Sequence, residues 1–188
     1  MKFATHFTFF SFILLSYIVQ NLFLYPIESS LRSDEHTAIV SLLYLPHGMK
    51  VLYGIMLGPM SAGYIFLAQY VSFGWFFGFS TENLIGSILG CVSIMLPIIL
   101  LNASAKKGVF SAPVNYELMK INVVWTLITL SLFTALLDSY LHMKLYFDVV
   151  DIDVFTYFII GDFCGAIAIF MLFLFVYRPI MNKILLRK

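Results

Sequence analysis

The sequence predicts an all-α fold: a polytopic membrane helix bundle of about six transmembrane helices that forms one domain over residues 1–188. Of the 188 residues, 61% are hydrophobic and 11% are charged, whereas a soluble domain carries about 25% charged residues. The apolar residues gather into segments close to the roughly 20 residues that cross the hydrocarbon core of a bilayer. Lysine and arginine are distributed unevenly between the connecting loops, as the positive-inside rule predicts for membrane proteins.

Six apolar segments make up most of the chain. Each is expected to be a helix, because a backbone in lipid must satisfy its own hydrogen bonds. The first segment is longer than the apolar core of a signal peptide, about 7–15 residues, and no small-residue cleavage site follows it, so we expect an uncleaved helix. The six segments are Phe7–Tyr25, Thr37–Leu57, Ser61–Phe79, Leu84–Leu101, Lys120–Leu141 and Phe155–Tyr177.

The second segment is predicted to be broken at Pro46. Proline lacks a backbone N–H and clashes with the preceding helical turn, yet it suits the first turn of a new helix. Gly48, two residues later, permits unusual dihedral angles. We therefore expect a non-helical residue or a sharp kink within Tyr44–Gly48, with the freed carbonyl groups facing protein rather than lipid.

The loop charges predict that both termini are cytoplasmic. We expect the protein to lie in the inner membrane of a bacterium. With the N-terminus inside, eight lysines and arginines fall on the inner side and two on the outer side. The remaining basic residue, Lys50, is placed within the membrane. The longest polar stretch, Asn102–Met119, is expected to be a loop, and no separate soluble domain is predicted.

Ionisable side chains inside the apolar segments are the candidate ligand-binding residues, because a charge is costly to bury in a membrane. His47 and Lys50 follow the predicted break, on a helix face that Gly54 and Gly58 share. Such a face is expected to point into the bundle. It is either part of a ligand or ion site, or a structural kink whose lysine extends toward the membrane surface.

The later segments add two acids and a second histidine. Asp138 and His142 lie one turn apart and could pair, but they lie near the outer end of their helix, where we expect a solvated site. Asp162 is the most deeply placed acid, and we expect Lys50 to approach it directly or through one bridging water or polar group. Asp138 or His142 could join this network. The candidate ligand-binding residues are His47, Lys50, Asp138, His142 and Asp162, with Ser131 and Thr134 on the same stripe as Asp138.

Small residues on several segments predict close helix packing and contact with a partner protein. They are Gly54, Gly58, Gly86, Gly90, Gly161 and Gly165. The cysteines, Cys91 and Cys164, lie in apolar stretches, where a free cysteine behaves as a small hydrophobic residue. Neither a disulfide nor a metal site is predicted, and no cofactor is indicated.

Two short motifs resemble a known family of membrane sensors. Leu45–Gly48, followed by an apolar helix as far as Gly58, is similar to the Trp-x-Pro-Ala-Gly segment of MASE1 integral membrane sensor domains. Ile160–Gly165 is similar to their Gly-Asp-x-x-Gly segment, and the two motifs occur in the same order. The resemblance implies a sensing module. Since that family has more helices and a cytoplasmic signalling domain, this chain is expected to act through a separate partner protein.

The sequence contains no motif typical of an enzyme or of a nucleic-acid-binding protein. Two acids on successive helices resemble intramembrane aspartyl proteases, but the tyrosine before Asp138 and the first glycine of Gly-x-Gly-Asp before Asp162 are absent. No metalloprotease helix, Ser–His pair, phosphate loop or basic patch occurs. We expect a non-enzymatic ligand-sensing or ligand-binding module of MASE1-like type in the lipid bilayer. The alternatives are an accessory subunit of a membrane complex and a transporter's substrate-binding subunit, because six helices with cytoplasmic termini also resemble those of vitamin transporters.

Overall fold

The computed structural model describes residues 3–31, 41–104, 121–146 and 151–185, which are helical apart from short connections. Four stretches of these residues are long and apolar enough to cross a membrane: His6–Leu31, Leu45–Phe77, Thr81–Leu101 and Ile152–Val176. The helical fold and its membrane-spanning character are therefore as predicted. The number six stays a prediction, because the second and third predicted segments fall within the single stretch Leu45–Phe77 and the fifth is not among the four.

The first helical rod contains a π-helical turn that points a polar side chain inward. Helix α1 (Phe3–Val19) continues through the π-turn Gln20–Leu24 into α2 (Tyr25–Leu31). Gln20 is only 2% exposed. Its amide donates to Ser41 Oγ over 2.8 Å, and its carbonyl oxygen accepts the N–H of Leu45 over 3.0 Å. The π-turn thus brings a side chain to the start of the next helix, whose first N–H groups have no partner within the helix.

That next helix, α3 (Leu45–Leu57), begins next to the predicted break. Ser41–Tyr44 is non-helical, and Pro46 lies in the first turn, where its missing N–H costs nothing. The N–H of Tyr44 donates to the carbonyl of Gly161 over 2.9 Å, so this irregular backbone bonds to protein. Residues 32–40 lie outside the described residues, so the prediction that a helix is broken here stays a prediction.

Gly58 reverses the chain between α3 and α4. Its φ of +61° belongs to the region that favours glycine, and the 3₁₀ turn Gly58–Ser61 leads into α4 (Ala62–Phe77). Each of the two helices packs against α1. At one end, Tyr53 and Tyr64 pack around His6. At the other end, Tyr44 and Phe73 pack on Tyr17. Helix α3 therefore runs antiparallel to both α1 and α4.

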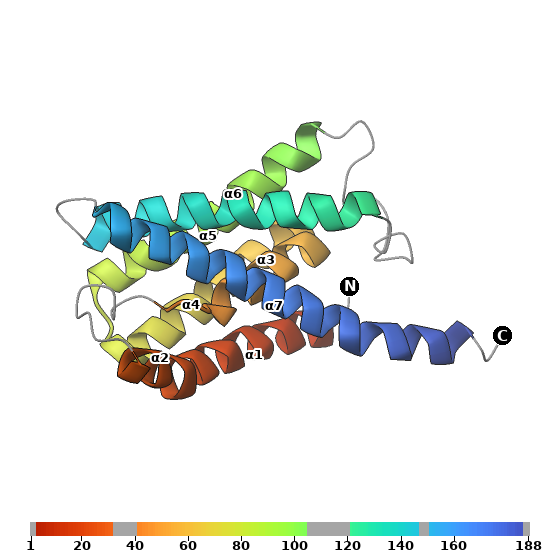
Figure 1. The fold of residues 1–188 in the computed structure, drawn as a ribbon, viewed down its shortest axis with the longest axis horizontal. Coiled ribbons are helices and arrows are strands. Elements are labelled where there is room, and N and C mark those ends of the chain that lie inside the picture. Colours follow the sequence, from red (N-terminus) through yellow and green to blue (C-terminus); the bar gives the residue numbers. More distant parts are fainter. Residues whose placement is uncertain (1–2, 32–40, 105–120, 147–150, 186–188) are drawn as a thin grey trace.

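The remaining helices are α5 (Thr81–Ser104), α6 (Ile121–Tyr146) and α7 (Ile152–Leu185). Helix α6 packs between α5 and α7, and α7 also packs along α3. Figure 1 shows α6 and α7 side by side across the bundle, with the last turns of α7 extending beyond the other helices. The start of α1 and the end of α7 lie at the same end of the bundle.

Glycines on α7 allow the backbone of Ser41–Tyr44 to approach closely. A Cβ atom at Gly161 would collide with the carbonyl oxygen of Ser41, and one at Gly165 with that of Tyr44. Gly54, Gly86 and Gly90 similarly face Ile98, Tyr146 and Gln69, while Gly58 makes the turn. All of these glycines except Gly58 therefore serve contacts within the chain, and contact with a partner protein through these helix faces stays a prediction.

The outer surface of the helices is strongly apolar. Trp75 is 82% exposed and Phe175 is 79% exposed. An aqueous surface that exposes many large apolar side chains would be unstable, whereas hydrocarbon chains solvate such side chains well. The surface is therefore compatible with contact with a lipid bilayer.

Candidate functional site

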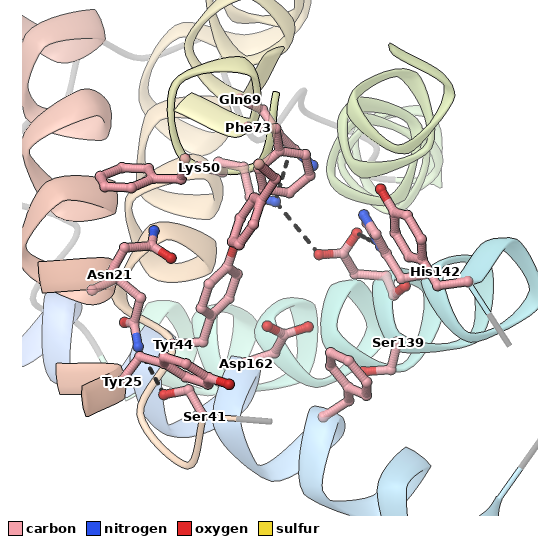
Figure 2. Close-up of a pocket in the computed structure, with 16 residues that line it drawn as sticks. Asn21, Tyr25, Ser41, Tyr44, Lys50, Gln69, Phe73, Ser139, His142 and Asp162 are labelled. Atoms are coloured by element: carbon pink, nitrogen blue, oxygen red, sulfur yellow. Dashed lines mark hydrogen bonds and ion pairs between the residues drawn. The ribbon is translucent and has the colours of Figure 1, made fainter. Parts of the chain in front are cut away.

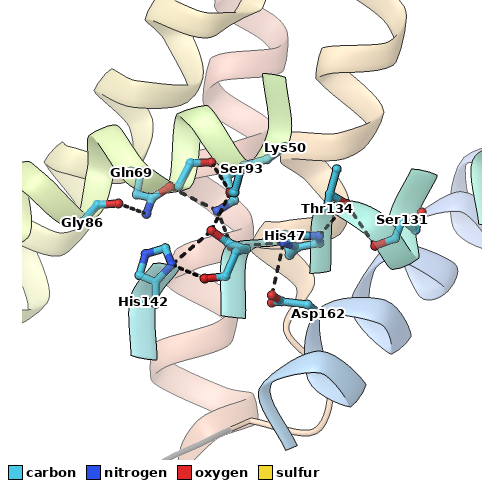
Figure 3. A network of polar contacts seen from close by, with 11 residues as sticks. His47, Lys50, Gln69, Gly86, Ser93, Ser131, Thr134, His142 and Asp162 are labelled. Carbon is cyan, nitrogen blue, oxygen red and sulfur yellow. Dashed lines mark hydrogen bonds and ion pairs between the residues drawn. The ribbon is translucent and has the colours of Figure 1, made fainter. Parts of the chain in front are cut away.

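The candidate ligand-binding residues, far apart in the sequence, meet inside the bundle. His47 and Lys50 come from α3, Asp138 and His142 from α6, and Asp162 from α7 (Figure 3). His47 is 0% exposed, Lys50 1%, Asp138 3% and Asp162 4%. We call these residues the charged cluster. Because lysine and aspartate are almost never fully buried without a partner, the contacts within the cluster decide its stability.

Asp138 is at the centre of the charged cluster. Its Oδ2 lies 3.2 Å from His47 Nδ1 and 3.5 Å from Lys50 Nζ. Its Oδ1 accepts a 2.6 Å hydrogen bond from Ser93 Oγ and lies 3.1 Å from His142 Nδ1. Four side chains from three helices thus surround one carboxylate. The expectation of a solvated outer end was wrong for Asp138, because α3 and α5 cover the acid from the side.

Lys50 contacts a different acid from the one predicted. Its Nζ lies 3.5 Å from Asp138 Oδ2 and donates to Gln69 Oε1 over 3.1 Å. No ion pair joins Lys50 to Asp162 among the residues that the structure describes. One helical turn separates His47 from Lys50, so the histidine meets α7 while the lysine points toward α4 and α6.

Asp162 has a weaker set of partners than Asp138. Its Oδ2 lies 3.4 Å from His47 Nδ1, and in the described part of the chain this is its one ion-pair contact. Two carboxylates and one ammonium group give the cluster a formal charge of −1 when both histidines are neutral. A buried site with this charge favours a further cation, whether a proton, a metal ion or a cationic group of a ligand.

The two nitrogens of His47 face different kinds of partner. Nδ1 faces the two carboxylates, which when ionised only accept hydrogen bonds. Nε2 lies 3.1 Å from Thr134 Oγ1, and the hydroxyl of Thr134 donates to the carbonyl of Ser131 over 3.0 Å. Since that hydroxyl proton is already used, Thr134 Oγ1 is free to accept the Nε2–H of His47.

A cavity of about 500 Å³ adjoins the charged cluster. Figure 2 shows Asp162 and His142 on one side of it, with Lys50 and Gln69 on another. Its wall combines these charged and amide groups with aromatic rings. The lining residues outside the cluster include Gln20, Asn21, Tyr25, Ser41, Tyr44, Phe73, Phe76, Phe77, Ser139, Tyr146 and Phe158.

Neither Gln69 nor Ser93 was predicted from the sequence to be a site residue. Gln69 is 1% exposed and links Lys50 to the backbone carbonyl of Gly86, to which its amide donates over 3.3 Å. It is an isolated amide in an otherwise apolar segment, and that isolation was the available signal. Ser93 continues the stripe of Gly86 and Gly90, so its role as a donor to Asp138 could not be separated from close packing.

The cluster and the cavity together have the features of a binding site. The cavity falls within the about 300–1,000 Å³ usual for small-molecule pockets, and it combines apolar walls with a few convergent polar groups. Comparisons with known protein families, with curated proteins and with solved structures found no match.

Proposed function

We propose that the protein is a non-enzymatic membrane module that binds a small molecule in the cavity and passes that event to a partner protein. The observation that carries the proposal is the cavity of about 500 Å³ beside a charged cluster in which every residue except the half-buried His142 is buried. A cluster that served folding alone would be expected to close on itself without leaving space. Here Lys50, Asp138 and Asp162 all line the space.

The lining indicates the chemical class of the ligand. The formal charge of −1 favours a compound with a cationic group, which would contact Asp162. Phe73, Phe76 and Phe77 offer aromatic faces to an apolar body or to the cation itself. A zwitterionic compound would additionally use Lys50. We therefore expect small primary amines or amino acids rather than anions.

The start of α3 is the element that we propose responds to the ligand. It contributes His47 and Lys50 to the cluster, and its N-terminal backbone rests on α7 through Gly165. Membrane transporters also build their sites from discontinuous helices whose ends lie inside the bundle. A sensor of the MASE1-like type and a transporter subunit share this requirement for a polar pocket, whereas an accessory subunit does not need one.

Ligand-induced stabilisation tests the proposal. The purified protein in mild detergent is heated with a panel of primary amines, amino acids and carboxylates, and the midpoint of unfolding is measured. A compound that binds the folded state raises that midpoint, because it stabilises that state by RT ln(1 + L/Kd), where L is the concentration of the compound. We expect a rise with cationic or zwitterionic compounds.

The matched variants are Ser139→Phe, which fills the cavity, and Leu136→Phe, which adds the same ring on the exposed side of α6. Ser139→Phe should abolish the rise and Leu136→Phe should keep it. A panel without effect, or an equal rise in Ser139→Phe, would contradict a ligand site in this cavity.

We also propose that the chain crosses a bacterial inner membrane six times, with both termini on the cytoplasmic side. The reversal at Gly58 supports counting α3 and α4 as separate passes. The start of α1 and the end of α7 lie at the same end of the bundle (Figure 1). This supports the placement of both termini on the same side of the membrane. Reporter fusions at Lys106 and Lys188 should report the cytoplasm, and a fusion at Asp151 the outside. An external signal at Lys188 would overturn this topology.

A further inference from the structure

We propose that His47, Asp138 and Asp162 form a binding site for one first-row divalent transition metal ion, with Zn²⁺ as the reference ion. The three ligand atoms would be His47 Nδ1 and the Oδ2 atoms of the two aspartates. They come from three helices, α3, α6 and α7, and all lie within 4.8 Å of one another. The inference does not require that the cavity binds a small molecule, so the two proposals can fail independently.

The spacing of the ligand atoms fits a metal ion. Zinc lies about 2.0–2.2 Å from histidine nitrogen and carboxylate oxygen, so two ligands at tetrahedral angles are about 3.3 Å apart. His47 Nδ1 lies 3.2 Å from Asp138 Oδ2 and 3.4 Å from Asp162 Oδ2. A modest inward rotation of the side chains would bring all three atoms to one ion.

The atoms around these ligands are those that a metal site requires. Metal-binding histidines usually donate their other N–H to an oxygen, and metal-binding carboxylates are themselves hydrogen-bonded. Thr134 Oγ1 is free to accept the Nε2–H of His47 over 3.1 Å. The second oxygen of Asp138 accepts from Ser93 Oγ over 2.6 Å. His47 and Asp138 therefore each have a group that orients them: Thr134 for the histidine and Ser93 for the aspartate.

The choice of metal follows from the ligand types. Imidazole with two carboxylates suits zinc and its neighbours, whereas calcium and magnesium prefer oxygen ligands alone. Three protein ligands leave a fourth position for water or another ligand, as in catalytic and exchangeable zinc sites. Asp138 and Asp162 both line the cavity, so that position can be reached from it.

Lys50 is the competitor for this site. Its ammonium group lies 3.5 Å from the same Oδ2 atom of Asp138 that the metal would use. Metal binding requires that this charge withdraw toward Gln69, with which Lys50 already shares a 3.1 Å contact, or that it lose its proton. We therefore expect Lys50 to weaken metal binding.

The test uses the purified full-length protein, freed of metal with a chelator and then titrated with Zn²⁺ or Co²⁺. The number of metal ions bound per protein molecule is measured by elemental mass spectrometry. The visible absorption of bound Co²⁺ also shows whether its coordination is tetrahedral. We expect one tightly bound ion. His47→Gln and Asp162→Asn should abolish that binding, while the matched variants His6→Gln and the exposed Asp153→Asn should keep it.

Two further variants keep the test decisive if a ligand variant fails to fold. Thr134→Val removes the group that orients His47 and should weaken binding about 10–100-fold. Lys50→Met removes the competing charge and should strengthen binding about tenfold or more, with a larger metal-induced rise in the unfolding midpoint. A wild-type protein that binds no ion, or variants at His47 and Asp162 that bind as well as the wild type, would overturn the proposal. Weaker binding by Lys50→Met would do so too.

Discussion

Two neighbouring parts of α3, residues 46–50 and 51–54, are both largely buried but are stabilised in different ways. The first, polar part, from Pro46 to Lys50, carries the histidine and lysine of the charged cluster. The second, apolar part, from Val51 to Gly54, packs against the apolar side chains of α5, including Ile94 and Ile98. The second part depends mainly on shape, which many side chains supply, and its one polar side-chain contact in the described part of the chain joins the hydroxyl of Tyr53 to His6 Nδ1 over 2.9 Å. The polar part needs particular partners from α4, α5, α6 and α7 at set distances, and it leaves a cavity beside them.

The comparison predicts that the largest loss of stability will come from the centre of the polar part. Asp138→Asn leaves the ammonium group of Lys50 buried without a charged partner at 3.5 Å. Breaking a buried ion pair in this way costs about 3–5 kcal/mol. Denaturant titration in detergent micelles should show this decrease in the free energy of unfolding. Asp153→Asn, at an exposed aspartate on α7, should change it by less than about 0.5 kcal/mol, and an equal loss in both would remove the distinction.

The contact between α7 and the start of α3 gives the second prediction. Gly165→Ala places a methyl group against the carbonyl oxygen of Tyr44, and the backbone on both sides resists movement. Overpacking of this kind costs about 1–3 kcal/mol. The matched substitution is Gly63→Ala on α4, where a Cβ atom meets nothing within 4 Å. Since alanine favours helices, that variant should be neutral or slightly more stable, and a loss there as large as at Gly165 would count against a packing effect.

A pair of double-mutant cycles can show which acid Lys50 depends on. Because Lys50 Nζ contacts Asp138 directly, Lys50→Met and Asp138→Asn should be coupled by about 0.5–3 kcal/mol. The cycle of Lys50→Met with Asp162→Asn should show a smaller coupling, since His47 separates those two groups. Unfolding free energies of the single and double variants measure both values. A larger coupling to Asp162 would restore the pairing that the sequence analysis favoured.

The smallest effect is expected in the apolar part. Ile98→Val removes one methyl group that faces Gly54 and should cost about 0.5–1.5 kcal/mol. Ile98 is 0% exposed, whereas its neighbour Ile99 is 45% exposed, so Ile99→Val should have almost no effect. The same denaturant titration applies. If Ile98→Val cost more than Asp138→Asn, the charged cluster would not be the part of the bundle most sensitive to substitution.

The sequence by itself determined the helical fold, the apolar character of the long segments and the identity of the ionisable residues that matter. Each of these depends on composition along the chain, since a run of apolar residues in lipid has to be helical. The start of a helix near Pro46 followed in the same way from a local rule, because proline fits a first turn and not an interior one.

The partners of those residues were decided only by the tertiary structure. The scarcity of opposite charges within the apolar segments suggested that Lys50 would neutralise Asp162, and the position of Asp138 near a helix end suggested that it would be solvated. Instead, the rotation and tilt of α3 against α6 place Asp138 beside Lys50 and turn His47 toward Asp162. Similarly, Gly161 and Gly165 pack against the Ser41–Tyr44 backbone of the same chain. Rotation about a helix axis changes which residues meet without changing the hydropathy of any segment, so the sequence pattern carries no record of it.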